Sequence, residues 1–442
     1  MGRKSFQRHR SLVNMDSEIG LLRGLFESVA DKRASNTVHK LSDILMSGFA
    51  MFSLKYLSVL EFEQQTVVER ENLRNVYGIE KICSDVQMRR VLDNHDPDFI
   101  RKEYAKRFKA LQNTGLLEDY TYKIGSSSYL LVSCDGVQHF SSKSLHCSCC
   151  LEKKHQDGSK TYHHNMLCAA LVHPEKREVF LLNTEPMIQQ DGVEKNDCER
   201  NAAKRLQQNM KSDYACYDNQ YHFLFVEDAL YANAAHIETL QSNGYAYILN
   251  VKPDSHKTLF AQVAGKRTRK QLQTHSFKQY GITYHFEWVN NLLLCNAHPN
   301  LRVNFLYCRQ TDKNGKTTTF TWITNISINQ NRLWAFMKAA RARWKIENET
   351  FNTLKNLGYH FEHNYGHGDD HLSTMFAYLM MIAFYIDQFI QACSRTFQQL
   401  ENALQTKTKL WSTIRAVFQT TLVNSINQIY HTVAYLFAVK LE

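Results

Sequence analysis

The sequence predicts a mixed α/β protein whose sheet is covered by helices. Three observations support this fold class. Residues 1–125 have mainly helical patterns, residues 126–254 alternate strands with helices, and the C-terminal residues again have apolar positions at helical spacing. A strand, a hairpin, and then alternating helices and strands are typical of a mixed sheet with helices packed against it.

The central strands are predicted from short apolar runs between polar breaks. The run Tyr129–Cys134 ends at Asp135-Gly136, and Met166–His173 and Val179–Asn183 are joined by a short polar link that predicts a hairpin. A helix over 198–210, a strand over 222–226, a helix over 232–242 and a strand over 245–251 complete this part.

The N-terminal residues 1–125 are predicted to be helical. Apolar residues step by three or four from Val38 through Leu41 and Leu45 to Phe52, and Ser84 is placed to cap a second helix. A third helix over 99–111 is rich in Lys and Arg. It is interpreted either as a DNA-contacting helix or as an ordinary solvated surface.

Residues 255–314 are predicted to form a basic, strand-rich insertion. No acidic residue occurs between Ser255 and Phe286, while six basic residues do: Lys257, Lys266, Arg267, Arg269, Lys270 and Lys278. Positive charge without counter-charges favours phosphate binding. Residues 315–380 are assigned to the core together with 126–254, and residues 381–442 to C-terminal helices.

Composition limits the class of protein. The 442 residues carry a net charge of +10, which favours a polyanionic partner, and 11 scattered Cys exclude a complete disulfide framework. The longest apolar run, 375–386, is too short to span a bilayer and is predicted to be a buried helix. No signal peptide is recognised, so we expect a cytoplasmic protein without membrane contact.

Three acidic residues are the main candidates for chemistry. Asp135 and Asp228 each follow an apolar strand, where a carboxylate can be a turn residue or helix cap, or can bind a cation at the rim of the sheet. Glu347 shares a helical face with Arg343 and Phe351, and the alternative to a catalytic role is an exposed Arg343–Glu347 ion pair. Packing of Trp344, Phe351 and Leu354 is expected to hold Glu347 inward. Converging carboxylates would suit Mg²⁺ and phosphoryl transfer.

These residues resemble those of DDE transposases of bacterial insertion sequences, in the group named after insertion sequence four. The group's signature is Tyr, two residues, Arg, three residues, Glu, six residues, Lys. Arg343 and Glu347 match it within Arg-Trp-x-Ile-Glu, whereas Ala340 stands in place of Tyr and Lys355 lies one residue late. Glu349 is therefore a rival for the third acid, and Glu347 is preferred because the surrounding motif fixes the register.

The resemblance implies a ribonuclease-H-like catalytic core with an insertion between Asp228 and Glu347. It implies Mg²⁺, with Mn²⁺ as a substitute, held by Asp135, Asp228 and Glu347. DNA phosphates would contact Arg343, Lys355 and the insertion residues Lys266, Arg267, Arg269 and Lys270. The expected partners of this bacterial, DNA-associated enzyme are the element's terminal inverted repeats, target DNA and a second copy in a homodimer.

Secondary candidates remain open. Cys147-x-x-Cys150 with His155, His163 and His164 could bind structural zinc, but the spacing is loose and free thiols with surface histidines are favoured. The stretch 360–370 has a metal-like composition and is interpreted mainly as a polar loop. Glu185 and Glu199 are candidate supporting acids, and Trp322 and Trp344 could stack on a flipped base or pack in the core.

The predicted function is Mg²⁺-dependent cleavage at transposon ends followed by strand transfer into target DNA. Two alternatives are kept. One is an inactive or repurposed DNA-binding protein, which the missing Tyr and the displaced Lys355 favour. The other is a ribonuclease-H-like nuclease that cleaves without strand transfer.

Overall fold

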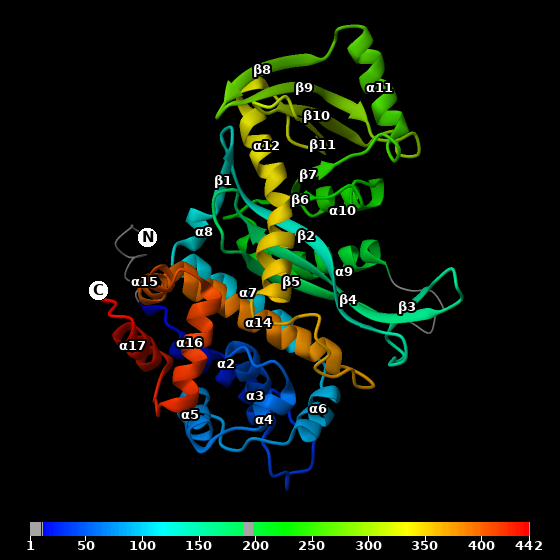
Figure 1. Cartoon of the computed structure of the whole chain (residues 1–442). Helices are drawn as coiled ribbons and strands as arrows, with labels where there is room; N and C mark the ends of the chain where they lie inside the picture. Colours follow the sequence, from blue (N-terminus) through cyan, green and yellow to red (C-terminus); the bar gives the residue numbers. More distant parts are fainter. Residues whose placement is uncertain (1–9, 11, 189–197, 442) are drawn as a thin grey trace.

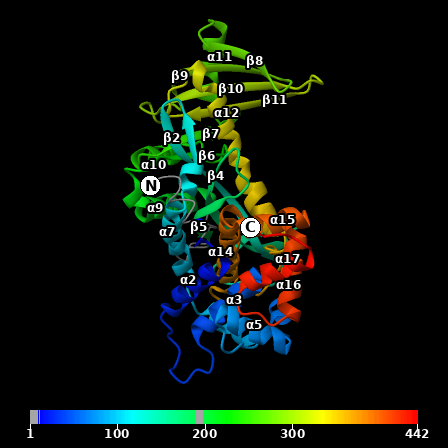
Figure 2. The same ribbon diagram turned by 90° about the vertical axis from the view of Figure 1, so that its left-hand side faces the viewer.

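The computed structural model of this chain describes residue 10 and residues 12–188 and 198–441. One large mixed sheet runs through the centre, with strands in the order β3-β4-β2-β6-β7-β11-β10-β9-β8, β1 paired to β2, and β5 paired to β4. Helices lie on both of its faces, as Figure 1 and the turned view in Figure 2 show. The predicted fold class, a mixed α/β sheet flanked by helices, is confirmed.

The first seven strands of the sheet are β1 (Thr121–Ile124), β2 (Ser127–Ser142), β3 (Leu151–Lys154), β4 (Lys160–Val172), β5 (Phe180–Met187), β6 (Phe223–Glu227) and β7 (Ala246–Asn250). Strands β2, β4 and β5 are antiparallel neighbours, and the predicted hairpin is β4–β5. Strands β6 and β7 run parallel to β2. Three antiparallel strands followed by two parallel strands form the ribonuclease-H-like arrangement that the resemblance implied.

Strand β2 is longer than the sequence predicted. It was expected to end before Asp135, yet pairing with β4 continues to Ser142, with a bulge between Gln138 and Phe140. Val137 and Phe140 are buried beyond the polar break, and this burial keeps the strand on the sheet. Asp135 therefore lies within β2 and not at its end.

The faces of the core sheet are covered by different helices. The helices α9 (Glu199–Tyr214) and α10 (Ala234–Ser242) lie on one side, and α12 (Leu333–Arg341) crosses the other (Figure 2). The segment after α12 was predicted as one helix over 341–355. It instead consists of a 3₁₀ turn, η3 (Ala342–Trp344), a π-helical segment, η4 (Ile346–Phe351), and α13 (Asn352–Asn356).

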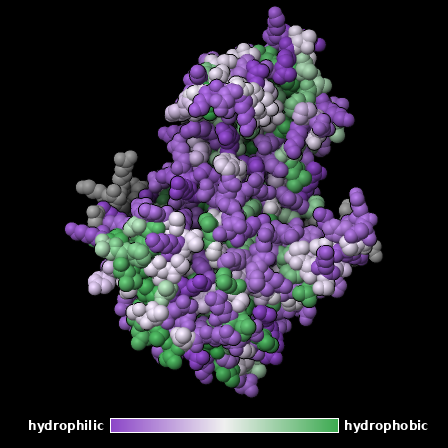
Figure 3. Space-filling view, viewed as in Figure 1, coloured by the Kyte–Doolittle hydropathy of each residue, from purple (hydrophilic) through white to green (hydrophobic). Residues whose placement is uncertain are grey.

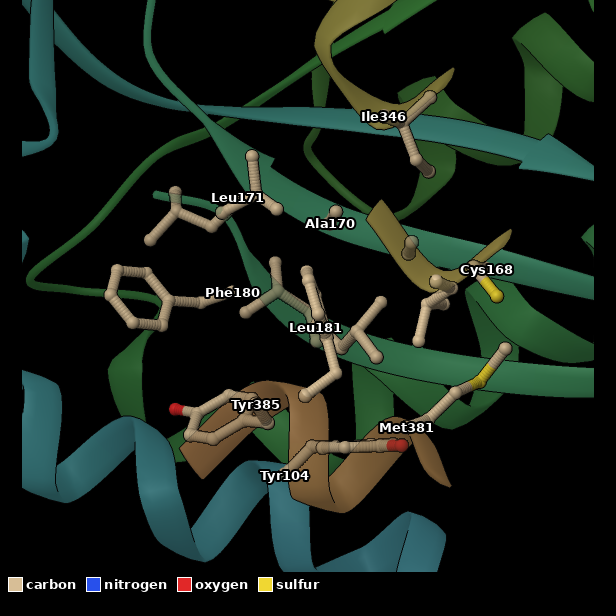
Figure 4. Packing of buried hydrophobic residues seen from close by; sticks show 14 of the residues in the cluster. Tyr104, Cys168, Ala170, Leu171, Phe180, Leu181, Ile346, Met381 and Tyr385 are labelled. Carbon is tan, nitrogen blue, oxygen red and sulfur yellow. The ribbon is translucent and has the colours of Figure 1, made fainter. Parts of the chain in front are cut away.

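Two of the three predicted anchors of this segment are correct. Phe351 and Leu354 are buried, but Trp344 is 51% exposed and does not pack in the core. Ile346 takes the anchoring position instead, in the same buried cluster as Tyr104 of α7 and Tyr385 of α14 (Figure 4). The change to 3₁₀ and π geometry rotates the helix, so that Trp344 faces solvent.

Residues 255–314 contain the predicted strands and one helix that was not predicted. The elements are α11 (Lys257–Thr268), β8 (Gln273–Gln279), β9 (Ile282–Leu293) and β10 (Arg302–Thr311), followed by β11 (Thr317–Thr324). In α11 only Leu259 and Val263 are buried, which leaves too weak a periodic signal for a sequence-based prediction. Strand β11 pairs antiparallel with β7 and so joins these strands to the core sheet (Figure 1).

The two ends of the chain form helices that gather around α14 (Leu372–Cys393). The N-terminal helices are α2 (Met15–Glu27), α3 (Leu41–Ser53), α4 (Val59–Glu63), α5 (Val67–Tyr77), α6 (Asp85–Asp93), α7 (Asp98–Asn113) and α8 (Leu116–Asp119). The C-terminal helices are α15 (Arg395–Leu404), α16 (Lys407–Thr420) and α17 (Ile426–Leu436). As predicted, Ser84 caps α6 by accepting a hydrogen bond from the Gln87 amide.

Helix α14 includes the predicted buried run. By length and composition it is the one helix of the described residues that could cross a membrane, but 94% of its most apolar stretch is buried inside the protein. Asp387 lies within the helix, buried at 2.6 Å from the ammonium of Lys55. Helix α14 contacts α3 and α6 as well as β5, so it is the core helix between the terminal helices and the sheet. The division at residues 380 and 381 stays a prediction and falls inside this helix.

The basic helix α7 uses part of its charge internally. Arg101 is paired with Asp98 and Asp213, and the buried Arg107 is paired with Glu18. Lys102 and Lys106 remain exposed.

The face shown in Figure 3 is largely hydrophilic over the sheet, and hydrophobic residues gather at the lower left, in the region of α17, where Tyr435 and Leu436 are exposed.

Candidate active site

Asp135 lies on β2, and Asp228 directly follows β6, the parallel neighbour of β2. Strand β2 pairs with β6 in the register Leu130↔Phe223 to Val132↔Phe225. The printed pairing ends there; continued by three residues, it would bring Asp228 level with Asp135 on strands about 4.8 Å apart. Asp228 directly follows β6, and its side chain accepts a hydrogen bond from the Leu230 amide at 2.8 Å. The topology therefore puts the two aspartates on adjacent chain segments of the core, and their convergence stays a prediction.

The carboxylate of Asp135 is held in a strongly acidic environment. One oxygen accepts a hydrogen bond from the Gly136 amide at 2.9 Å. Burial raises the pKa of Asp135 to about 7, with further contributions from the negative charges of Glu347 and Glu199. The Gly136 amide and Arg343 oppose this shift only in part. Because the repulsion is not compensated by the protein, a bound cation would stabilise the ionised form.

Glu347 reaches the same acidic group from the helical segment η4. The Ser133 hydroxyl donates to the backbone carbonyl of Arg343 at 2.9 Å, which fixes η3 against β2 near Asp135. Arg343 and Glu347 form an ion pair at 2.5 Å. The Glu347 side chain is 47% exposed, so it is not held inward as expected but lies at the solvent edge of the site.

The rival acid, Glu349, lies in a different environment. Its charge acts on Lys345, whose ammonium donates to the Lys176 carbonyl. Glu347, in contrast, is the acid of η4 that raises the pKa of Asp135. These surroundings favour Glu347 over Glu349 as the third acid.

A fourth acid, Glu199, interacts electrostatically with both aspartates. It is the first residue of α9 and accepts a hydrogen bond from the Tyr231 hydroxyl. Burial raises the pKa of Glu199, and repulsion from Asp228 adds to this effect. A Cβ atom on Gly136 would lie only 3.0 Å from a Glu199 carboxylate oxygen, so a residue without a side chain allows this approach. The sequence analysis gave Glu199 only as a candidate supporting acid. No local pattern indicates that it contacts β2, which lies more than 50 residues earlier in the chain.

The other supporting acid, Glu185, has a different role. It is paired with Arg205 at 2.5 Å. Trp322 is buried in β11, which leaves it as a core residue and not a stacking platform.

The predicted phosphate-binding residues are distributed over two places. Lys355 lies on α13 and pairs with Glu362 at 2.7 Å. Lys266, Arg267, Arg269 and Lys270 lie at the C-terminal end of α11 and just after it, at the top of Figure 1, far from the acidic group. Of these, Arg267 is paired with Glu287 at 2.5 Å. Arg343 is the basic candidate that the structure places beside the acids.

The Cys and His candidates assemble only in part. Cys147, Cys150 and His164 lie together, and the fourth member is His367, from the stretch interpreted as a polar loop. His155 instead contacts Thr161 at 2.6 Å, and neither it nor His163 belongs to the group.

The sequence model of the family described as "Transposase DDE domain" matches residues 142–385. The match includes Asp228 and Glu347 but begins after Asp135, whose assignment depends on the geometry above. None of the curated proteins matches the chain.

Two solved structures illustrate how distant the structural relatives are. A cryo-EM structure of a piggyBac transposase synaptic complex with hairpin DNA has a TM-score of 0.40 at 9% identity, covering 98% of this chain and 80% of that one. The crystal structure of the NurA nuclease from Sulfolobus solfataricus has a TM-score of 0.23 at 10% identity, covering 61% and 97%. At these scores neither structure supports an argument about this chain.

Proposed function

Because the chain belongs to the transposase DDE domain family, we propose that it is a DNA transposase that cleaves strands at transposon ends and joins the released 3′ ends to target DNA. The observation that supports this most is the electrostatic coupling of four acids: Glu347 and Glu199 both act on Asp135, and Asp228 acts on Glu199. Membership in the group named after insertion sequence four stays a prediction.

Asp135, Asp228 and Glu347 are the proposed ligands for Mg²⁺, with Mn²⁺ as a substitute. Their donor atoms are all carboxylate oxygens, which hard divalent cations prefer. The raised pKa of Asp135 fits this role, because burial and, to a smaller extent, the charges of Glu347 and Glu199 disfavour an ionised carboxylate that a cation would stabilise. When bound, such ions activate a water or a 3′-hydroxyl and stabilise the leaving oxygen.

The chain's own residues would orient the DNA around this group. Arg343 is placed to exchange its contact with Glu347 for one with a phosphate oxygen. Glu199 is proposed to support Asp135 and Asp228 from the start of α9. Lys355 would bind phosphate after leaving Glu362. The basic end of α11 is proposed to bind the DNA backbone outside the acidic group, in a homodimer assembled on the element's inverted repeats and target DNA.

The test is strand cleavage on DNA that contains the element's own ends. Asp228→Ala should reduce the single-turnover rate by about 10³-fold, which corresponds to about 4 kcal/mol of transition-state stabilisation. Asp254→Ala is the matched control, since Asp254 is an exposed aspartate before α11 and should keep the full rate. Equal rates for Asp228→Ala and the unmodified protein would exclude the proposed mechanism.

The second candidate is a DNA-binding protein without catalysis. Ala340 has only a methyl group, so this position supplies no hydroxyl, and Lys355 is paired with Glu362. Salt-sensitive binding to the correct ends without Mg²⁺-dependent cleavage would favour this candidate. Cleavage without joining in a strand-transfer assay would indicate the nuclease alternative.

A further inference from the structure

Four metal-binding side chains from three separate segments meet outside the acidic group. Cys147 and Cys150 lie in the loop between β2 and β3, His164 lies on β4, and His367 lies in the loop before α14. Their ligand atoms all lie within 4.8 Å of one another. Cys150 and His164 are buried, and the other two are half-buried.

The distances match the edges of a tetrahedron around zinc. Bonds of about 2.3 Å to sulfur and about 2.05 Å to nitrogen give edges of about 3.8 Å for S···S, about 3.5 Å for S···N and about 3.3 Å for N···N. The sulfur atoms of Cys147 and Cys150 are 3.8 Å apart. The two histidine Nε2 atoms are 3.3 Å apart. The three measured S···N distances are 3.2, 3.3 and 3.5 Å.

Neither a disulfide nor hydrogen bonding accounts for the cluster. A separation of 3.8 Å is far too long for a disulfide, whose S–S bond is about 2.05 Å. Hydrogen bonding alone is also insufficient, because the four ligand atoms make five close contacts with one another but carry at most one proton each. Two sulfur and two imidazole donors select zinc over Mg²⁺, which prefers oxygen.

The side chains around the cluster hold the two imidazoles in place. The Phe140 ring lies 4.5 Å from the His367 ring, centroid to centroid, and His139 stacks on His164 at 5.9 Å. Rings packed in this way keep the ligand nitrogens aimed at one point.

We propose that Cys147, Cys150, His164 and His367 bind one structural zinc ion that fastens the loop between the Glu347 segment and α14 to the sheet. Four protein ligands fill a tetrahedral shell and leave no open position, which is typical of structural and not catalytic zinc. This site is independent of the acidic group and of the proposed transposase activity.

The same loop is held from its other side by α6. The Asp93 carboxylate accepts hydrogen bonds from the backbone amides of the four consecutive residues Asp369, Asp370, His371 and Leu372. A Cβ atom on Gly368 would lie 2.3 Å from an Asp93 oxygen, so only glycine fits there. Zinc on one side and Asp93 on the other would fix the chain that leads from the Glu347 segment into the core helix.

The first experiment measures zinc in the full-length protein, purified without chelators, by elemental analysis. We expect about one zinc per chain in the unmodified protein, and loss of most of it in Cys150→Ser and in His367→Ala. Cys149→Ser and His163→Ala are matched controls, since each changes the residue next to a ligand and should keep the zinc. An unmodified protein without zinc, or equal losses in controls and ligand variants, would overturn the proposal.

A second measurement covers the case in which ligand variants fail to fold. Co²⁺ exchanged into the unmodified protein should give the visible bands of tetrahedral cobalt and a thiolate charge-transfer band. His367→Cys should keep the metal and increase the charge-transfer intensity by about half, because three thiolates replace two. A cobalt spectrum without thiolate bands, or one unchanged by His367→Cys, would contradict the assignment of these ligands.

Discussion

The acidic group and the Cys/His cluster share strands β2 and β4 but are organised in opposite ways. The four Cys and His ligand atoms lie within 4.8 Å of one another, and the described part of the chain has no comparably tight group of carboxylates. Asp135 and Glu347 instead repel each other, and Glu347 leans toward Arg343 and solvent.

The difference follows from the charges of the ligands. Neutral imidazoles and thiols can pack closely before a metal arrives, because they do not repel one another. Carboxylates cannot, since each added negative charge raises the free energy of ionising the next. A structural metal site can therefore be built by packing alone, whereas the acidic group is expected to close only around cations and the DNA phosphate.

The largest expected effect separates Glu347 from Glu349. Glu347→Gln should reduce the cleavage rate by about 10³-fold, because it removes a carboxylate that acts on Asp135. Glu349→Gln should change the rate by less than about threefold, since Glu349 interacts with Lys345. Single-turnover cleavage at saturating Mg²⁺ measures both. A larger loss for Glu349→Gln would move the third acid to that position and would remove Glu347 from the acidic group.

Features that depend on local pattern could be predicted from the sequence. The spacing of 93 positions between Asp135 and Asp228 equals the offset of the β2–β6 register, as Leu130↔Phe223 shows. The β4–β5 hairpin and the Ser84 cap likewise depend on neighbouring residues, which a sequence displays directly.

What could not be predicted depends on contacts between distant residues. His367 lies 203 positions after His164, so no local spacing identifies it as the fourth ligand of the cluster. Arg107 belongs to the basic helix interpreted either as DNA-contacting or as solvated surface, but Glu18 pairs with it across 89 positions. The exposure of Trp344 depends on the 3₁₀ and π turns of its segment, which an expected α-helix does not include.

A smaller effect is expected for Glu199, which tests how far the acidic group extends. Glu199→Gln should reduce the cleavage rate by about 10–100-fold and raise the Mg²⁺ concentration needed for half-maximal rate, because it removes charge beside both aspartates. The matched control is Glu185→Gln, since Glu185 pairs with Arg205 outside the group. If both variants lose the same activity with an unchanged Mg²⁺ requirement, Glu199 has only a structural role.

The smallest effect is a pH dependence of stability that comes from Asp135. Its pKa of about 7 in the folded protein lies above the value near 3.9 of an unfolded chain. The folded state therefore binds this proton more tightly, and the resulting stability is complete below about pH 4 and is lost as pH rises through 7. In magnesium-free buffer, the unfolding temperature should fall between pH 5.5 and 8.5 by about 2–4 °C more for the unmodified protein than for Asp135→Asn.

Added Mg²⁺ should restore the unfolding temperature of the unmodified protein at pH 8.5, because the cation replaces the lost proton. It should not raise the unfolding temperature of Asp135→Asn. Without Mg²⁺, Glu347→Gln should reduce the fall in unfolding temperature, since Glu347 has the largest effect on Asp135 of the charged side chains around it. The Cys/His cluster provides the contrast: His163→Ala, which leaves its four ligands intact, should show the same pH difference as the unmodified protein. If the unfolding temperature of Asp135→Asn fell by the same amount between pH 5.5 and 8.5, the titrating group would be a residue other than Asp135. The contrast between the closely packed Cys/His cluster and the mutually repelling acidic group would then no longer hold.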